Sequence, residues 1–252
     1  MNELEVDRVS LAFGGLKVLD EVSLWVKQSE LLALIGPNGA GKTSVFNCIS
    51  GIYNPTGSIR FQGRDILGMR PHDIAALGIM RTFQHAEIFP RMSVADNLMT
   101  ARHQMVKTNA LAEMLGLPSV QREEVRHRAE VDRIIELIEL GRYRESLVGN
   151  LPYGIQKLVG FGRALAAEPA ILLLDEPSAG LTRDEREDLA HFILKTREEL
   201  AISIIWIEHD MQMVADLADR IHVLDYGRSL ADGPPETVLN DEAVIKAYLG
   251  TV

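Results

Sequence analysis

Cysteine, long apolar runs and basic clusters are all scarce in this sequence. Cys48 is the only cysteine, which excludes an internal disulfide and fits a reducing compartment. The longest apolar runs, such as "ILLLD" and "LLALIG", are far too short to span a bilayer, so we expect any membrane association to depend on a partner. The first residues, "MNELEVDRVSLAF", lack the basic start and apolar block of a signal peptide.

Basic residues are fewer than acidic ones, with 26 Lys and Arg against 36 Asp and Glu. The formal net charge is −10 and no dense basic stripe is visible, which argues against nucleic acid as the main partner. The composition is that of a globular protein, with 46% hydrophobic and 25% charged residues. The 252 residues are enough for one large domain or for a core with an inserted subdomain.

Short apolar runs predict strands along both halves of the chain. Residues 30–37, 171–177 and 203–210 contain continuous apolar runs that end at polar residues, which is typical of buried parallel strands. Three other segments alternate between apolar and polar residues and predict half-exposed antiparallel strands: "LEVDRVSLAF", "EVSLWV" and "SIRFQG".

The middle of the chain has a different pattern. From roughly 93 to 148, apolar residues recur at helical spacing among many charges, as in "SVADNLMTARH" and "QREEVRHRAEVDRIIELIELGRY". This pattern predicts an α-helical subdomain inserted into an α/β core. The core is expected to resume with helices near 155–167 and 183–200.

The segment "GPNGAGKT", residues 36–43, follows an apolar strand and precedes the helical pattern "SVFNCI". It satisfies the phosphate-loop pattern G-x-x-x-x-G-K-[ST] in the strand–loop–helix context that this motif needs. Glycines let backbone N–H groups approach phosphates closely, and a helix N-terminus favours an anion. The alternative is a glycine-rich turn that binds nothing, and the flanking strand and helix argue against it.

Two side chains of this loop have specific expected roles. Lys42 would reach the terminal phosphates, and the hydroxyl of Thr43 would hold Mg²⁺. The candidate nucleotide-binding residues of the segment are Gly36, Pro37, Asn38, Gly39, Ala40, Gly41, Lys42, Thr43 and Ser44.

The run "ILLLDEP" supplies a pair of carboxylates at the end of a predicted buried strand. Asp175 can hold Mg²⁺ beside a phosphate loop, and Glu176 can orient and deprotonate an attacking water. The alternative is a solvated acidic pair at the edge of the sheet. Kinases, GTPases and transport ATPases all use such residues, although the guanine-reading motif N-K-x-D is absent.

Three further segments narrow the class. Gln84 ends the candidate strand "IMRTFQ", His209 follows the strand of "SIIWIEHD", and "LPYGIQK" spans residues 151–157. With these the sequence resembles the nucleotide-binding subunit of ABC transporters. It resembles most the ATP-binding components of branched-chain amino-acid importers, through "GIMRTFQHAEIFPRMSVADNL", the Tyr-Gly form of the signature, "LLLDEPSAGL", "IIWIEHDM" and the ending "VIKAYLG".

The resemblance covers essentially the whole chain and implies one ABC ATPase domain over residues 1–252. Its fold class is α/β: a P-loop NTPase core of the RecA-like type with an antiparallel β-subdomain and an inserted α-helical subdomain. Residues 1–92 and 155–252 would form the core and the β-subdomain, and residues 93–154 the helical subdomain ending in the signature segment. The implied cofactors are ATP and Mg²⁺.

In this family two ATPase domains face head to tail, with each ATP between the phosphate loop of one and the signature segment of the other. The resemblance implies that Phe13 stacks on adenine, unless it is a strand aromatic packed in the core. Gln84 would lie near Mg²⁺ and the attacking water, unless it is a solvated loop residue. His209 would contact the γ-phosphate and hold the water with Glu176, unless it is only structural.

The signature segment departs from the usual Leu-Ser-Gly-Gly-Gln of the family. Tyr153 and Gly154 are expected to face the nucleotide, and the importer group tolerates the tyrosine. Pro152 removes a hydroxyl and a backbone N–H that could have met the γ-phosphate, and Ile155 removes an amide. Thr182 stands where the family usually has an aspartate that contacts the other subunit, although threonine still offers a hydroxyl.

The resemblance also implies partners. A groove that includes Ile88 and Phe89 would receive a short helix of a transmembrane permease, unless both residues only pack within the helical subdomain. The other expected partners are a second ABC ATPase subunit, identical or related, and indirectly a solute-binding protein, and not nucleic acid. The expected location is peripheral, on the cytoplasmic face of the inner membrane.

Two other functions remain open, namely a soluble ABC ATPase scaffold of the iron–sulfur assembly type and the ATPase of a lipopolysaccharide exporter. The transported molecule also remains open among branched-chain amino acids, urea, amides and aromatic acids, because selectivity resides in the permease and the binding protein.

Overall fold

The computed structural model describes residues 2–82, 88–105 and 118–249. Contacts group the chain into two compact units, each of which is described by itself. The first unit comprises Met1–Arg81, Ala170–Ala179 and Thr196–Val252. The second unit comprises Thr82–Pro169 and Gly180–Lys195.

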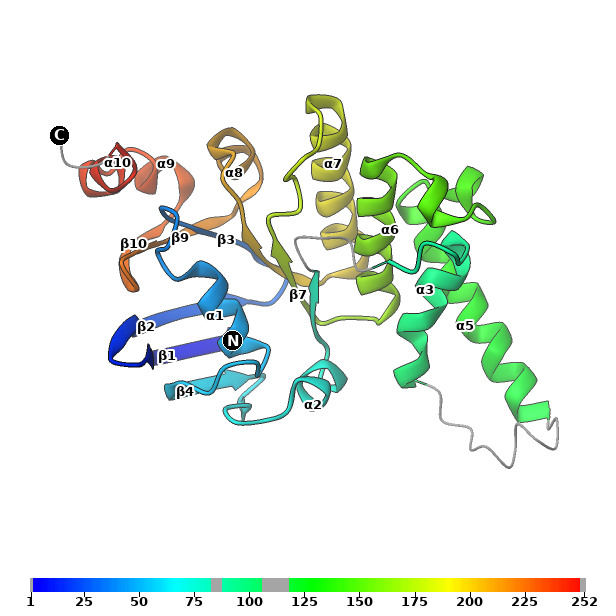
Figure 1. The fold of residues 1–252 in the computed structure, drawn as a ribbon, viewed down its shortest axis with the longest axis horizontal. Coiled ribbons are helices and arrows are strands. Elements are labelled where there is room, and N and C mark those ends of the chain that lie inside the picture. The colour runs from blue at the N-terminus through cyan, green and yellow to red at the C-terminus, as the bar shows by residue number, and fades with distance from the viewer. Residues whose placement is uncertain (1, 83–87, 106–117, 250–252) are drawn as a thin grey trace. The chain divides into compact units, whose positions relative to one another are not determined.

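The first unit contains an antiparallel sheet with the strand order β2-β1-β4-β5 (Figure 1). β1 pairs antiparallel with both β2 and β4, which confirms the three strands predicted from alternating residues. The strands are β1 (Asn2–Phe13), β2 (Leu16–Lys27), β4 (Thr56–Phe61) and β5 (Arg64–Asp65).

A six-stranded sheet has the order β10-β9-β3-β8-β7-β6. β3 pairs parallel with β8 and β9, and β7 pairs parallel with β8, while β10 is antiparallel to β9. Every residue of β3, β7 and β8 is buried, so the three predicted parallel strands are confirmed. The strands are β3 (Leu31–Ile35), β6 (Ile79–Thr82), β7 (Ile171–Asp175), β8 (Ser203–Ile207), β9 (Arg220–Asp225) and β10 (Arg228–Gly233).

Helix α1 (Lys42–Ile49) lies between the two sheets (Figure 1). Its apolar side chains share one core cluster with the inner faces of both sheets, where Leu32 and Leu34 of β3 point. Ala33 and Ile35 point to the opposite face, where they pack with residues of α8, α9 and the start of α10. The remaining helices of this unit are α2 (Pro71–Ala76), α8 (Met211–Leu217), α9 (Pro235–Val238) and α10 (Glu242–Leu249).

Helices make up most of the described part of the second unit, and α3 and α5 fall in the segment whose periodicity predicted helices. Helices α3, α5 and α6 pack against one another (Figure 1). Helix α6 begins at Tyr153, two residues before the predicted start, and Pro152 is its N-cap residue. The helices among the described residues of this unit are α3 (Val94–Arg102), η1 (His103–Met105), α5 (Pro118–Leu137), η2 (Gly141–Tyr143), η3 (Val148–Asn150), α6 (Tyr153–Ala166) and α7 (Arg183–Leu200), the last assigned to this unit up to Lys195.

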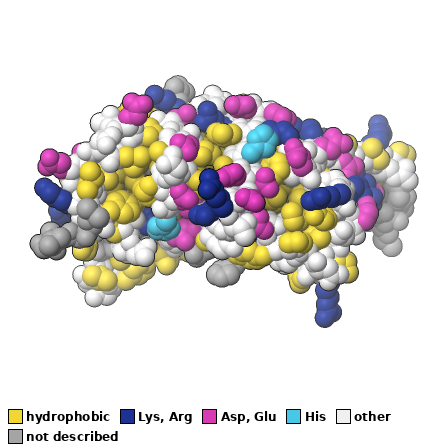
Figure 2. Space-filling view, turned by 90° about the horizontal axis from the view of Figure 1, so that it is seen from above, with side chains coloured by type: hydrophobic (Ala, Val, Ile, Leu, Met, Phe, Trp, Pro, Cys, Tyr) yellow, Lys and Arg dark blue, Asp and Glu magenta, His cyan; other side chains and the backbone are white. Residues whose placement is uncertain are grey.

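The surface shown in Figure 2 carries acidic and basic side chains interspersed among apolar ones. None of the helices in the described ranges combines the length and the apolar character that crossing a membrane requires.

Candidate active site

The phosphate loop connects β3 to α1 and needs glycine at two positions for steric reasons. Gly36 has a φ of 150°, and a Cβ built there would lie 2.1 Å from the carbonyl oxygen of Leu224. Gly41 has a φ of 104°, and its Cβ would lie 2.8 Å from Cδ2 of Leu19. Because real Cβ atoms do not approach so closely, larger residues at either position would displace the loop.

The turn between β9 and β10 is hydrogen-bonded to the phosphate loop. The backbone N–H of Gly227, between β9 and β10, donates to the carbonyl oxygen of Ala40 at 2.9 Å. The carbonyl oxygen of Gly227 accepts from the N–H of Asp20 at 2.8 Å. The β9–β10 turn is therefore bonded both to the phosphate loop and to β2.

Lys42 folds back onto the loop. Its Nζ donates to the carbonyl oxygens of Gly36 at 2.7 Å and Pro37 at 3.0 Å, and only 6% of the residue is exposed. Burial lowers the pKa of the Lys42 ammonium, while the carboxylates of Glu176 and Asp175 oppose that shift. These carbonyl contacts are ones that a phosphate could replace.

The first turn of α1 carries backbone N–H groups that have no acceptor within the helix itself, which favours an anion. Gly41 is the N-cap residue and provides no side-chain hydrogen bond, and no acidic residue occupies this turn. Thr43 is exposed and Ser44 is half-buried at this end of the helix. The loop thus leads directly into a helix N-terminus, and phosphate binding by the loop stays a prediction.

Asp175, at the end of β7, is held by an arginine. Oδ2 of Asp175 accepts from Nη2 of Arg81 at 2.5 Å, and Nη1 of Arg81 donates to Oδ1 of Asn47 on α1 at 2.7 Å. The exposed fractions of the Arg81 and Asp175 side chains are 9% and 8%, so this is a buried ion pair. The guanidinium group also lies over the ring of Phe46, 5.5 Å from its centroid.

Glu176 and His209 meet at the ends of neighbouring strands. Nε2 of His209 lies 2.8 Å from Oε1 of Glu176. The backbone of Glu176 has a φ of 48°, a left-handed conformation that is costly for a residue other than glycine. Its N–H donates to the carbonyl oxygen of Ile207 at 3.0 Å, so the residue is bonded to the end of the neighbouring strand β8.

Phe13 ends β1 and is not packed in the core. It is 48% exposed and makes an edge-to-face contact with Tyr53, with ring centroids 5.1 Å apart and an interplanar angle of 73°. The core alternative for Phe13 is therefore wrong, and an exposed ring face is consistent with stacking on a base. Gln84 lies outside the described residues, so its expected role stays a prediction.

In the second unit, the signature segment interlocks with the loop before α7. The ring of Tyr153 lies against Gly180, where a Cβ would be 3.2 Å from it. A carboxylate oxygen of Glu185 lies against Gly154, where a Cβ would be 2.3 Å away. Each glycine leaves room for a side chain of the other segment, so Gly154 is required by packing within the chain itself.

Thr182 has a local structural role. Its backbone N–H and its hydroxyl donate to Oε2 of Glu185 at 2.9 and 3.0 Å, and its Oγ1 accepts from the N–H of Glu185 at 3.4 Å. This reciprocal pattern is a capping box at the start of α7. The threonine that replaces the family's aspartate thus caps this helix.

Ile88 and Phe89 are placed differently from each other. Ile88 is half-buried, whereas Phe89 is 47% exposed. The centroid of the Phe89 ring lies 5.8 Å from the guanidinium carbon of Arg163. A permease groove at these residues stays a prediction.

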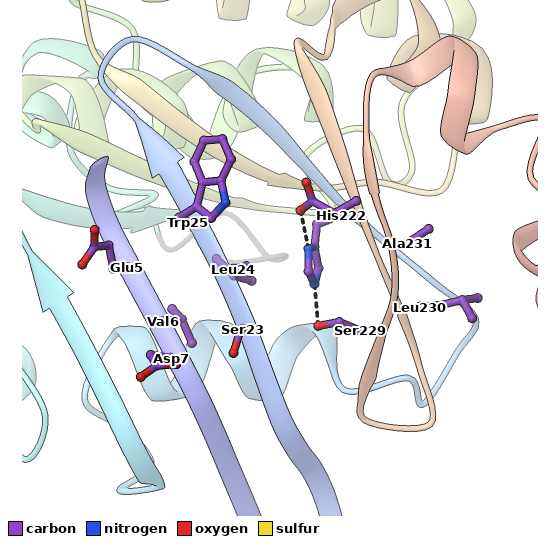
Figure 3. Close-up of a pocket in the computed structure, with 11 residues that line it drawn as sticks. Glu5, Val6, Asp7, Ser23, Leu24, Trp25, His222, Ser229, Leu230 and Ala231 are labelled. Carbon is purple, nitrogen blue, oxygen red and sulfur yellow. Dashed lines mark hydrogen bonds and ion pairs between the residues drawn. The ribbon is translucent and has the colours of Figure 1, made fainter. Parts of the chain in front are cut away.

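A pocket of about 600 Å³ opens among β1, β2, β9 and β10 (Figure 3). The imidazole of His222 lies 2.7 Å from Asp232 and 3.0 Å from the hydroxyl of Ser229, as the dashed lines in Figure 3 mark. Arg220 also donates to Asp232, so these bonds join β9 to β10. The lining residues in the described chain include none from the phosphate loop.

The sequence motifs did not single out Arg81 or Glu185. An arginine inside the apolar strand "GIMRTFQ" was a usable signal, because a buried arginine needs an acidic partner. Glu185 could have been found from the pattern Thr-x-x-Glu ahead of a helix, which is the signature of a capping box.

Comparisons with known proteins show which family the chain resembles. Residues 19–179 match the family model for ABC transporters, and residues 228–252 match the model for branched-chain amino acid ATP-binding cassette transporters. The solved structure of a nucleotide-free ATP-binding cassette from an ABC transporter has a TM-score of 0.85, with 29% identity and full coverage of both chains. An ATP-binding cassette in its ADP conformation has a TM-score of 0.86, also with 29% identity and full coverage of both chains.

Curated relatives match over nearly the whole chain. The chain is 41% identical over 248 residues to the high-affinity branched-chain amino acid transport ATP-binding protein BraF of Pseudomonas aeruginosa. The aligned residues cover 98% of this chain and 97% of that protein. It is 40% identical over 248 residues to the corresponding protein LivG of Escherichia coli K12, with the same coverage.

Proposed function

The chain belongs to the ABC transporter family of ATP-binding proteins, and from this premise we propose that it energises an importer of branched-chain amino acids. The observation that carries the substrate class is the 41% identity to BraF over 98% of the chain, together with the match of the C-terminal residues 228–252. The relatives at this similarity are importer subunits, so neither the scaffold nor the lipopolysaccharide-exporter alternative is favoured.

Hydrolysis would rest on residues of the first unit. Lys42 would leave the loop carbonyls and bind the terminal phosphates of ATP. Glu176 would accept the proton of the attacking water, and His209, which is already within hydrogen-bond distance of Glu176, would orient it and contact the γ-phosphate. Phe13 would stack on the adenine, since its ring is exposed at the end of β1.

The residues present fit a magnesium ion by their donor chemistry. The hydroxyl of Thr43 and the carboxylate of Asp175 are the hard oxygen ligands that Mg²⁺ prefers. Arg81 takes up Oδ2 of Asp175, and Oδ1 makes no hydrogen bond with the described residues. Bound Mg²⁺ would supply neutralisation of phosphate charge. Gln84 is the third expected ligand and lies outside the described residues.

The second unit would supply the opposite face of an ATP sandwich. The N–H of Gly154 and the start of α6 would face the γ-phosphate held by a second ATPase subunit, either a copy of this chain or a related one. ATP hydrolysis by this dimer would drive conformational change in a transmembrane permease. A solute-binding protein would deliver the substrate to the permease and so act on this chain only indirectly. The chain would then lie on the cytoplasmic face of the inner membrane, attached through the permease.

Uptake measurements test this function. Deletion of the coding sequence from its host should abolish energy-dependent uptake of radiolabelled leucine, isoleucine or valine. The parent sequence should restore uptake, and a matched Lys42→Ala variant expressed at the same level should not. Unchanged uptake of all three amino acids, with loss of urea or amide uptake instead, would contradict the proposed substrate class.

A further inference from the structure

Arg81 joins two elements that the proposed metal site depends on. One side of its guanidinium group donates to Asp175 at the end of β7, and the other side donates to Asn47 on α1. Helix α1 begins with Lys42 and Thr43. The planar fork of an arginine holds two acceptors at fixed positions, which a lysine ammonium cannot reproduce.

We propose that Arg81 is a positioning residue for Mg²⁺, which sets the carboxylate of Asp175 relative to the hydroxyl of Thr43. This inference rests on the proposed function, because it assumes that these two groups hold the metal. Arg81 fixes Oδ2 of Asp175 and leaves Oδ1 for the ion. The same guanidinium fixes α1 through Asn47, so the two ends of the site are set by one rigid group.

Two effects of Arg81 on the metal have opposite signs. Its positive charge near Asp175 repels a cation, so removing the charge alone would tighten metal binding. Its geometry favours Mg²⁺, because this ion demands a nearly ideal octahedral arrangement and tolerates misplaced ligands poorly. Partners that orient metal ligands are typically worth about 10–100-fold in metal affinity. We therefore expect geometry to outweigh charge repulsion.

The contacts around Arg81 support a positioning role over a purely charge-balancing one. A counter-ion for Asp175 would need no second acceptor, yet Oδ1 of Asn47 accepts from Nη1 of Arg81 at 2.7 Å. The guanidinium carbon also lies over the ring of Phe46, 5.5 Å from its centroid. These two neighbours belong to α1, so they orient the fork with respect to the helix that carries Thr43.

The test is the ratio of the ADP dissociation constants without and with Mg²⁺, measured by calorimetry on the full chain. ADP avoids turnover, so the ratio reports metal coupling and not activity. Arg81→Lys keeps the charge and loses the fork, and we expect the ratio to fall about tenfold or more. Asn47→Ala leaves the ion pair intact and releases α1, and we expect a smaller fall in the same direction.

Asp175→Asn is the control that tests the metal site separately from the positioning role of Arg81. If it leaves the ratio at the parent value, the metal site and the role of Arg81 are both overturned. If it collapses the ratio while Arg81→Lys and Asn47→Ala keep the parent ratio, only the role of Arg81 is overturned. A lower melting temperature of these two variants with an unchanged ratio would mean that Arg81 is merely structural. Asn47→Ala keeps the proposal testable if Arg81→Lys fails to fold.

Discussion

Nε2 of His209 lies 2.8 Å from Oε1 of Glu176, and the backbone of Glu176 has a left-handed φ of 48°. The two side chains therefore form one hydrogen-bonded unit at the ends of β7 and β8. Groups that act as a unit give non-additive losses when they are replaced.

Glu176→Gln should bind Mg-ATP and hydrolyse it about 10²–10⁴-fold more slowly, because the amide cannot accept the proton of the water. His209→Gln in that background should add little further loss. Single-turnover hydrolysis of radiolabelled ATP by the two single variants and the double variant measures both effects. Losses that multiply in the double variant would show that the two residues act independently.

Pro152→Ser should stabilise the ATP-bound dimer in a Glu176→Gln background. Pro152 caps α6 without any side-chain hydrogen bond, and a hydroxyl there could reach the γ-phosphate. A hydrogen bond to a charged group is worth about 1.5–3 kcal/mol, whereas losing the stiffness of proline costs about 0.4–1 kcal/mol. Sedimentation across an ATP titration measures the dimer.

Pro152→Ala is the matched control for that experiment, because it loses the proline without gaining the hydroxyl. Equal dimerisation of the serine and alanine variants would mean that Tyr153, packed on Gly180, holds the segment where the hydroxyl cannot act.

Thr182→Ala should lower the free energy of unfolding by about 0.5–2 kcal/mol, because it removes the cap of α7. Thr182→Asp, which restores the residue usual in the family, keeps a capping oxygen but places a carboxylate beside Glu185. It should be less stable than the parent because the two charges repel. Urea denaturation of the three proteins gives the order, and a parent-like alanine variant would contradict the capping role.

The thiol of Cys48 should be inert in the folded protein. It lies on α1 with 4% of the residue exposed, and burial raises its pKa to about 12. The reactive thiolate is therefore scarce at pH 8. Ellman's reagent should label one thiol only after unfolding in guanidinium chloride. Complete labelling of the folded protein within minutes would show that α1 opens readily.

The sequence was informative wherever one segment carries its own signal. β3, β7 and β8 are continuous apolar runs, and they were predicted correctly. The strand before residues 36–41 and the helix after them were also predicted correctly, because consecutive residues define both. The resemblance to ABC ATPases was likewise recognisable from short motifs. The start of α6 was placed two residues late, because Tyr-Gly after a proline reads equally well as a turn.

Long-range pairs could not be predicted in the same way. Arg81 and Asp175 are 94 residues apart and meet only because β6 lies next to β7 in the sheet. The packing of Glu185 on Gly154 depends on how α7 approaches α6. The exposure of Phe13 follows from the point where β1 ends, and a sequence pattern fixes such boundaries poorly.

Mg-ATP hydrolysis by the parent chain and by Lys42→Ala, assembled with the permease, tests the nucleotide site most directly. The lysine is held by carbonyl oxygens of its own loop at 2.7 and 3.0 Å, so its ammonium is already positioned beside the phosphate site. We predict that the parent hydrolyses ATP and that Lys42→Ala, folded to the same melting temperature, has lost nearly all turnover. Turnover of Lys42→Ala within a factor of about two of the parent, which is less than 0.5 kcal/mol in the barrier, would contradict the assignment of the phosphate loop.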